Sequence, residues 1–172
     1  MSDRQAERLA AVCLVVGSIL GIVGTFVPSA SLRGLSWGID GTFLVVGTAL
    51  LAVHFVRLGQ TVAAAGFIVF VAAETLIVGG SAMDLAASAP LVGAGASLWA
   101  ASFALISATT VYPTVVRGLG VVATILLAGS GLQLLAGRPL NALSRPLPFF
   151  AFPFLAATLV GFAWYHYSGR RD

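Results

Sequence analysis

Three carboxylates that lie in or beside long apolar runs are the residues of this sequence most suited to binding or proton chemistry. Glu74 stands thirteen residues into an apolar run that begins at Thr61, while Asp40 and Asp84 stand near the ends of neighbouring runs. An ionised side chain inside the hydrocarbon core of a membrane costs about 2.5–3.5 kcal/mol on insertion scales. Glu74 must therefore be paired, hydrated, protonated or used for binding. A carboxylate in this position is suited to bind a cation, a proton or a small polar molecule.

Further polar groups are expected at the same depth as these acids. They are Ser130, Gln133, Arg33, Arg138 and Arg145. Two interpretations of this set remain open. One is an outward-facing polar pocket with Glu74 at its base, because intramembrane acids usually mark functional sites. The other is a structural network in which arginines neutralise the acids and hold the loops onto the helices.

The two histidines, His54 and His166, stand near the ends of their apolar runs and beside aromatic residues. This setting is typical of the aromatic belt at a membrane interface, and it is the interpretation we favour over a pH sensor. Two histidines with no cysteine or carboxylate nearby in the sequence make a poor metal site, so no metal is predicted. Asp40, Gly47 and His54 recur at seven-residue spacing and share a helix face, but a continuous proton path there would need partners from other helices.

No arrangement of residues in the sequence predicts catalysis. Ser130 and His166 are expected at opposite ends of their helices, too far apart for a nucleophile and its base. Cys13 is the single cysteine, so an intrachain disulfide is excluded, and it is expected to be a small core residue. We therefore expect no catalytic residues and no cofactor, and whether the protein is an enzyme is left uncertain.

The elements that must position these residues are six long apolar runs. They cover residues 9–28, 39–56, 61–80, 90–112, 114–136 and 149–167. With 59% hydrophobic and only 9% charged residues, a chain of 172 residues could not bury this much apolar surface in a soluble core. Each run has roughly the 20 residues that cross a bilayer as a helix, and the runs lack the alternation of barrel strands. The predicted fold is all-α, a single domain (1–172) of six transmembrane helices.

Arginine supplies all nine of the basic residues and suggests the orientation. Six arginines fall on the side of the chain termini, and Arg33, Arg138 and Arg145 fall on the other. The positive-inside rule therefore predicts a multi-pass protein of a plasma or bacterial inner membrane with both termini in the cytoplasm. No basic cluster lies away from the membrane, so nucleic-acid binding is not expected.

Small residues at regular spacing predict close helix contacts, because helices in lipid associate where small side chains let their backbones approach. The clearest stripes are Gly17, Gly21 and Gly24; Gly66, Ala73 and Gly80; and Ala96, Ala100, Ala104 and Ala108. These stripes fit contacts within the chain, in a homo-oligomer, or with another membrane protein. The predicted function is a small transporter, channel or solute-binding protein acting through the pocket at Glu74, and the alternative is a membrane scaffold or accessory subunit.

Overall fold

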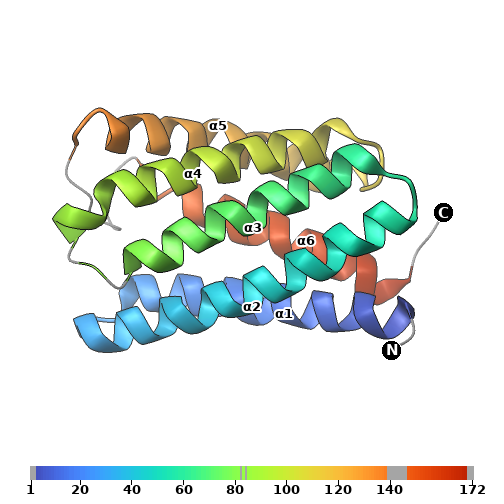
Figure 1. Cartoon of the computed structure of the whole chain (residues 1–172), viewed down its shortest axis with the longest axis horizontal. Coiled ribbons are helices and arrows are strands. Elements are labelled where there is room, and N and C mark those ends of the chain that lie inside the picture. Colours follow the sequence, from blue (N-terminus) through green and yellow to red (C-terminus); the bar gives the residue numbers. More distant parts are fainter. Residues whose placement is uncertain (1–2, 82, 84, 139–146, 170–172) are drawn as a thin grey trace.

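The computed structural model describes residues 3–81, 83, 85–138 and 147–169, and six helices account for most of them. They are α1 (Asp3–Phe26), α2 (Ala30–Arg57), α3 (Thr61–Ser81), α4 (Leu85–Ala108), α5 (Thr114–Leu135) and α6 (Ala151–Ser168). The helices run alternately up and down, so the start of α1 and the end of α6 lie at the same end of the bundle (Figure 1). We call this the terminal end and the other the distal end. The predicted all-α class is confirmed.

The helices form a closed ring. Each helix packs against its neighbours in sequence, and α6 returns to pack against α1. In Figure 1, α3 lies in front and α6 behind, with α1 and α2 below them and α4 and α5 above. The ring has two ends, and each of them holds a group of polar side chains.

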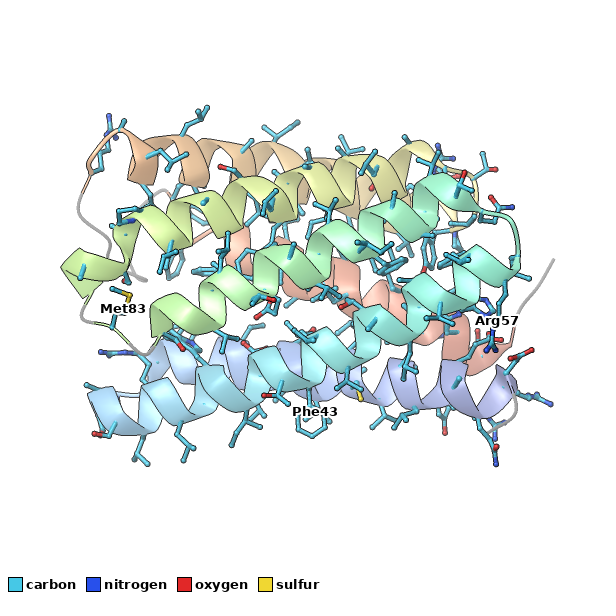
Figure 2. All side chains as sticks on the ribbon, viewed as in Figure 1. Phe43, Arg57 and Met83 are labelled. Carbon is cyan, nitrogen blue, oxygen red and sulfur yellow. The ribbon has the colours of Figure 1, made fainter. Side chains whose placement is uncertain are left out.

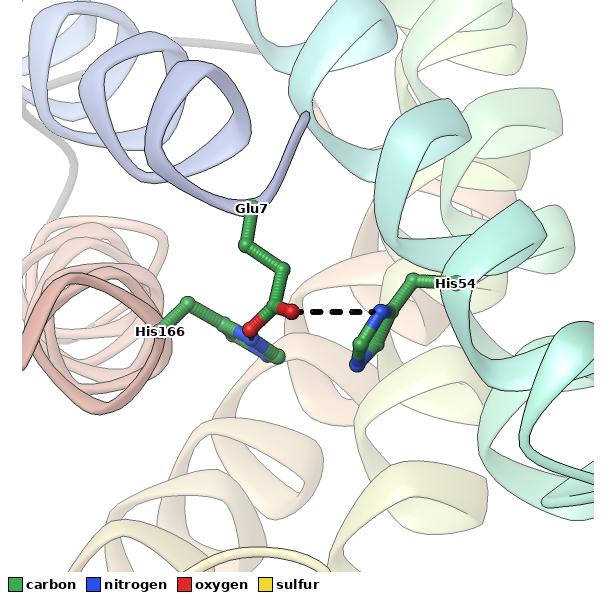
Figure 3. Close-up of side chains that lie close together, drawn as sticks. All are labelled: Glu7, His54 and His166. Atoms are coloured by element: carbon green, nitrogen blue, oxygen red, sulfur yellow. Dashed lines mark hydrogen bonds and ion pairs between the residues drawn. The ribbon is translucent and has the colours of Figure 1, made fainter. Parts of the chain in front are cut away.

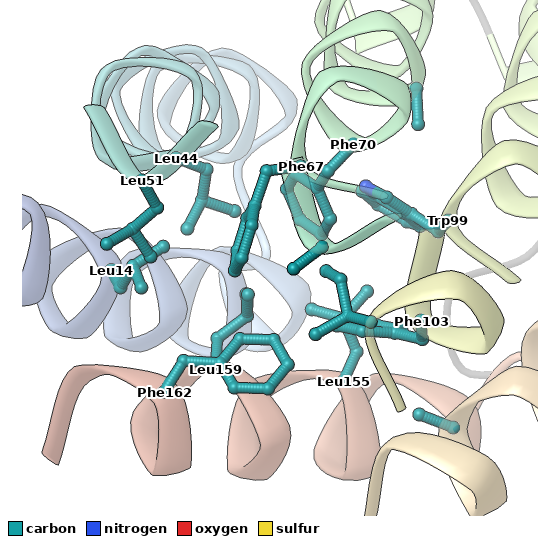
Figure 4. Packing of buried hydrophobic residues seen from close by; sticks show 14 of the residues in the cluster. Leu14, Leu44, Leu51, Phe67, Phe70, Trp99, Phe103, Leu155, Leu159 and Phe162 are labelled. Atoms are coloured by element: carbon teal, nitrogen blue, oxygen red, sulfur yellow. The ribbon is translucent and has the colours of Figure 1, made fainter. Parts of the chain in front are cut away.

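Large aromatic side chains fill the middle of the ring. Phe67 of α3, Phe103 of α4 and Phe162 of α6 are at most 1% exposed and meet across the centre (Figure 4). Their ring centroids are 5.6 Å apart for Phe67 and Phe162 and 6.1 Å apart for Phe103 and Phe162. We call these three residues the aromatic layer. It separates the polar groups of one end from those of the other.

The outer surface of the bundle is apolar, as a membrane requires. Side chains project from the outer faces of the helices (Figure 2). Among the large hydrophobic ones, Val115, Ile125 and Leu132 are 66–76% exposed. Within the described residues, five helices are long and apolar enough to cross a membrane. The remaining helix, α6, has 18 residues and ends in Trp164-Tyr165-His166-Tyr167, which lowers its mean hydropathy. The chain is therefore a membrane-embedded helical bundle.

Three helices begin earlier than the apolar runs predicted. The first, α1, starts at Asp3, six residues before its apolar run. Residues 29–38 were expected to form a loop, but α2 starts at Ala30 and, with 28 residues, is the longest helix rather than a short one. Its polar side chains bond to α1 instead of water: Ser36 Oγ donates to Leu20 O at 2.8 Å, and Trp37 Nε1 donates to Gly21 O at 3.3 Å. Similarly, α4 begins at Leu85 and contains Pro90, which removes only one hydrogen bond near the helix start.

Turns between the helices follow the predicted breaks. Gly59 has φ of +70° in the connection from α2 to α3, and Gly137 has φ of +80° just after α5. Glycine adopts this left-handed conformation without steric cost, so both helices can end sharply. Pro113 precedes α5 and has no side-chain capping bond.

The predicted glycine contacts on α1 and α3 are confirmed. A Cβ at Gly17 would lie 2.6 Å from Leu44 Cδ2 of α2, and one at Gly66 would lie 2.5 Å from Ile106 Cγ1 of α4. The alanine stripe on α4 is only partly an internal contact, since Ala96 and Ala100 are buried whereas Ala104 and Ala108 are exposed. A spacing of four residues advances by about 40° per step around a helix, so the stripe leaves the interface after two steps.

This difference gives a matched pair of substitutions on α4. Ala100→Leu should overfill a buried contact and lower the free energy of unfolding by about 1–3 kcal/mol, the usual cost of overpacking. Ala104→Leu places the same side chain on the exposed face and should leave stability unchanged. Thermal unfolding of both variants in detergent, followed by circular dichroism, measures the difference. Equal stability of the two variants would contradict the packing described for α4.

Candidate functional site: a cavity at the distal end

A cavity of about 390 Å³ opens within the distal end of the ring. Its walls come from α1, α2, α3, α4 and α6, together with Met83. Most of the lining is apolar or aromatic, and Trp37, Trp99 and Phe152 contribute rings. Ligand pockets in proteins commonly have volumes of about 300–1,000 Å³ with a few convergent polar groups, and this cavity has that character.

Asp40 is the acidic side chain that lines the cavity. It projects from α2 toward α1, where a Cβ at Gly21 would lie 2.8 Å from Asp40 Oδ2. Among the described residues, the buried atoms Asp40 Oδ1 and Ser18 Oγ have no hydrogen-bond partner. Ser18 also lines the cavity. Two buried polar oxygens thus border the same space, where a cation or a hydrogen-bond donor could satisfy them.

Glu74 lies behind the cavity wall rather than in the cavity. Its side chain is buried (1% exposed), and Glu74 Oε2 accepts a hydrogen bond of 3.1 Å from Trp99 Nε1. Glu74 Oε1 lies against α2, 3.1 Å from where a Cβ at Gly41 would stand. Because Trp99 lines the cavity, it connects Glu74 with that space. The prediction of a pocket around Glu74 is therefore corrected: Asp40 is the acid that lines the cavity, and Glu74 lies behind the cavity wall.

Arg33 does not neutralise either acid. Its guanidinium lies 5.8 Å from the ring centroid of Trp37, and Arg33 Nη1 is 3.5 Å from Val27 O. In the described part of the chain, salt bridges occur only at the terminal end. The expected network that pairs outer acids with Arg33 is therefore absent from these residues.

The other predicted pocket residues are dispersed. Ser130 is buried on α5 and donates to Leu126 O at 2.9 Å, and neither Ser130 nor Gln133 lines the cavity. Arg138 follows α5, is exposed, and does not line the cavity. Asp84 and Arg145 lie outside the described residues. Of the predicted set, Asp40 and Arg33 thus line the cavity, and Glu74 lies behind its wall.

A second polar cluster, which sequence reasoning missed, lies at the terminal end. Glu7 of α1 stands between His54 of α2 and His166 of α6 (Figure 3). Glu7 Oε1 is 3.6 Å from His54 Nδ1, and Glu7 Oε2 is 3.3 Å from His166 Nδ1. Tyr112, which precedes α5, bonds to the other nitrogen of His166, with 2.9 Å between Tyr112 Oη and His166 Nε2. We call these four residues the terminal cluster.

The terminal cluster corrects the interpretation of the histidines as an interfacial belt. His166 is only 5% exposed, and the His54 side chain is 12% exposed. The prediction of no metal site relied on the absence of a carboxylate near the histidines in the sequence, but the fold brings Glu7 to both of them. Helical periodicity could have placed Glu7 on a buried face of α1, since Glu7, Ala10, Ala11 and Leu14 follow the i, i+3, i+4, i+7 pattern, but not beside the histidines.

No continuous polar path joins Asp40 to His54 along α2. Between them, Gly47 packs closely against α1, where a Cβ at Gly47 would lie 3.1 Å from both Ala10 O and Cys13 Cβ. Thr48 Oγ1 donates a hydrogen bond within its own helix, to Leu44 O.

Comparisons with protein-family models, with curated proteins and with solved structures give no match to this chain. The function must therefore be inferred from the two polar sites themselves.

Proposed function

We propose that the protein binds a small cationic solute in the distal cavity and carries it across a membrane. Asp40 is the charged contact group in this proposal, and Glu74 with Trp99 holds the wall behind it. The orientation suggested by the arginines would place the cavity on the outer side and both termini in the cytoplasm.

The observation that carries the proposal is the Asp40 carboxylate in a cavity lined by aromatic rings. Asp40 Oδ1 is buried and has no hydrogen-bond partner among the described residues, although a carboxylate removed from water requires compensation. A bound cation would supply that compensation. Trp37, Trp99 and Phe152 offer ring faces or edges in the same cavity, and aromatic faces attract organic cations by about 0.5–2 kcal/mol each.

Position along α2 favours a cation over an anion. Arg33 stands seven residues before Asp40, about 10 Å nearer the distal end of the helix at the usual rise per residue. Its guanidinium lies over Trp37, and no described acid forms a salt bridge with it. Arg33 thus stands nearer the distal end of α2, whereas the charged lining group nearer the aromatic layer is the Asp40 carboxylate.

The scaffold alternative has less support. It rested on stripes of small residues that could bind other membrane proteins. The glycines of α1 and α3 contact helices of the same chain, as Gly17 does with Leu44 and Gly66 with Ile106. These two glycine stripes therefore need no external partner, and only Ala104 and Ala108 of the alanine stripe stay exposed.

Choline should bind the wild-type protein saturably, while its uncharged carbon isostere 3,3-dimethylbutan-1-ol should not. Two of the three tryptophans, Trp37 and Trp99, line the cavity, so intrinsic fluorescence in a Trp164→Phe background reports binding there. Asp40→Asn keeps the shape of the side chain but removes its charge and should abolish the choline response. Asp3→Asn, which changes an exposed acid at the terminal end, serves as the control.

Uptake of radiolabelled choline into proteoliposomes then tests the transport part of the proposal. Uptake should depend on the protein and be lost in Asp40→Asn. An unchanged choline response in Asp40→Asn would contradict the role of Asp40. Equal binding of choline and its neutral isostere would contradict selection for a cation.

A further inference from the structure

The terminal cluster brings together three metal-binding side chains from three different helices. Glu7, His54 and His166 each offer one ligand atom, and these atoms all lie within 4.8 Å of one another. Glu7 and His166 are buried and His54 is nearly so. Figure 3 shows the carboxylate of Glu7 directed into the space between the two imidazole rings. This site is distinct from the distal cavity, and the aromatic layer lies between the two.

The distances within the cluster are compatible with metal coordination as well as with hydrogen bonding. Hydrogen bonds between a cationic nitrogen and a carboxylate are usually about 2.7–2.9 Å long. The observed separations are 3.3 Å from Glu7 Oε2 to His166 Nδ1 and 3.6 Å from Glu7 Oε1 to His54 Nδ1. Two donors that each lie about 2.0–2.1 Å from a tetrahedral zinc ion are about 3.3 Å apart. The two nitrogen–oxygen pairs, each with a different oxygen of Glu7, are close to that spacing.

Tyr112 supplies the supporting bond that metal-binding histidines usually have. Such histidines present one nitrogen to the metal and donate the other N–H to a neighbouring acceptor, which sets the tautomer and the ring orientation. His166 Nε2 lies 2.9 Å from Tyr112 Oη in a buried contact. When Nε2 is protonated and its N–H donates a hydrogen bond to Tyr112 Oη, Nδ1 is unprotonated and its lone pair points toward Glu7. The imidazole is then in the form that binds a metal ion.

We propose that Glu7, His54 and His166 form a binding site for a divalent first-row transition metal ion, with zinc as the representative. Two imidazoles and one carboxylate suit such ions, whereas magnesium and calcium prefer sites built from oxygen alone. The ion would bind the buried carboxylate of Glu7. It would also link α1 to α2 and α1 to α6. The contact between α1 and α6 is the one that closes the ring. Metal binding and the stability of the closed ring are therefore expected to be coupled.

The test uses protein without an affinity tag, purified in detergent in the presence of a chelator. The chelator is removed before the titration. Calorimetric titration with Zn²⁺ should give one ion per chain, and Co²⁺ should develop the visible absorption of a nitrogen–oxygen site. Zn²⁺ should raise the thermal midpoint of the wild-type protein, and Mg²⁺ should not. Glu7→Gln, His54→Gln and His166→Gln should each abolish saturable binding. Tyr112→Phe should weaken it by about 10–100-fold, as loss of a supporting contact typically does.

Asp40→Asn is the matched control, because it removes the carboxylate of the distal cavity and should leave zinc binding intact. Saturable binding that survives in all three ligand variants would overturn the assignment. If those variants fail to fold, the wild-type protein alone decides the question. Absence of both saturable Zn²⁺ binding and a zinc-dependent rise in its thermal midpoint would overturn the proposal.

Discussion

Phe67→Ala should lower the free energy of unfolding by about 3–5 kcal/mol, the range found when a buried phenylalanine is truncated in a packed core. Phe67 is fully buried and belongs to the aromatic layer, where its ring stacks on Phe55 at 5.5 Å and meets Phe162 edge-on at 5.6 Å. Because α3, α2 and α6 all lose a contact when this ring is removed, the surrounding helices can close the void only by moving together.

Unfolding in mixed micelles with increasing sodium dodecyl sulfate, followed by far-ultraviolet circular dichroism, measures the effect of Phe67→Ala. Ile125→Ala is the control, since Ile125 is 66% exposed on the outer surface of α5 and its truncation leaves no internal void. The control should resemble the wild type. A loss of stability in Ile125→Ala as large as that in Phe67→Ala would mean that α5, too, buries its outer face.

Gly66→Leu should lower the stability of the fold at least as much as Phe67→Ala does. Here the cause is a side chain with no room, and not a void. A Cβ at Gly66 would lie 2.5 Å from Ile106 Cγ1 and 3.1 Å from the backbone oxygen Ser102 O. Ile106 can turn away, but backbone can move only if α4 moves with it. The expected loss therefore exceeds the about 1–3 kcal/mol typical of overpacking, and the variant should fail to fold or fold only at reduced temperature.

Gly79→Leu provides the control for this substitution on the same helix. A Cβ at Gly79 has no heavy atom within 4 Å among the neighbours in the described chain. The yield of monodisperse protein on size exclusion and the thermal midpoint should both stay near wild type in Gly79→Leu. Similar losses in both variants would attribute the effect to helix composition and not to the close approach of α3 and α4.

Most of the fold could be predicted from the sequence, because apolar length alone identifies helices that cross a bilayer. Errors arose where a helix extends beyond its apolar run. The hydropathy of the first turns of α2 predicted a polar loop, but Ser36 and Trp37 donate hydrogen bonds to the backbone of α1. Hydropathy cannot predict these bonds, because the acceptors belong to another helix.

The candidate sites were less predictable, for the same physical reason. Depth in the membrane could be inferred for Glu74 and Asp40, but not the direction in which each side chain points around its helix. The terminal cluster depends on the contact between α1 and α6, which joins Glu7 to His166 across 159 positions of the chain. Only the closure of the ring brings them together, and no local pattern encodes that closure.

In the proposed transport, the aromatic layer has a consequence for the action of a membrane voltage. An electric potential falls mainly across regions of low dielectric constant and little across hydrated ones. Phe67, Phe103 and Phe162 occupy such a region between the distal cavity and the terminal cluster. A cation held at Asp40 would therefore still have most of the field ahead of it. Its passage toward the terminal end would couple to the voltage by up to about 2.3 kcal/mol per unit charge for each 100 mV.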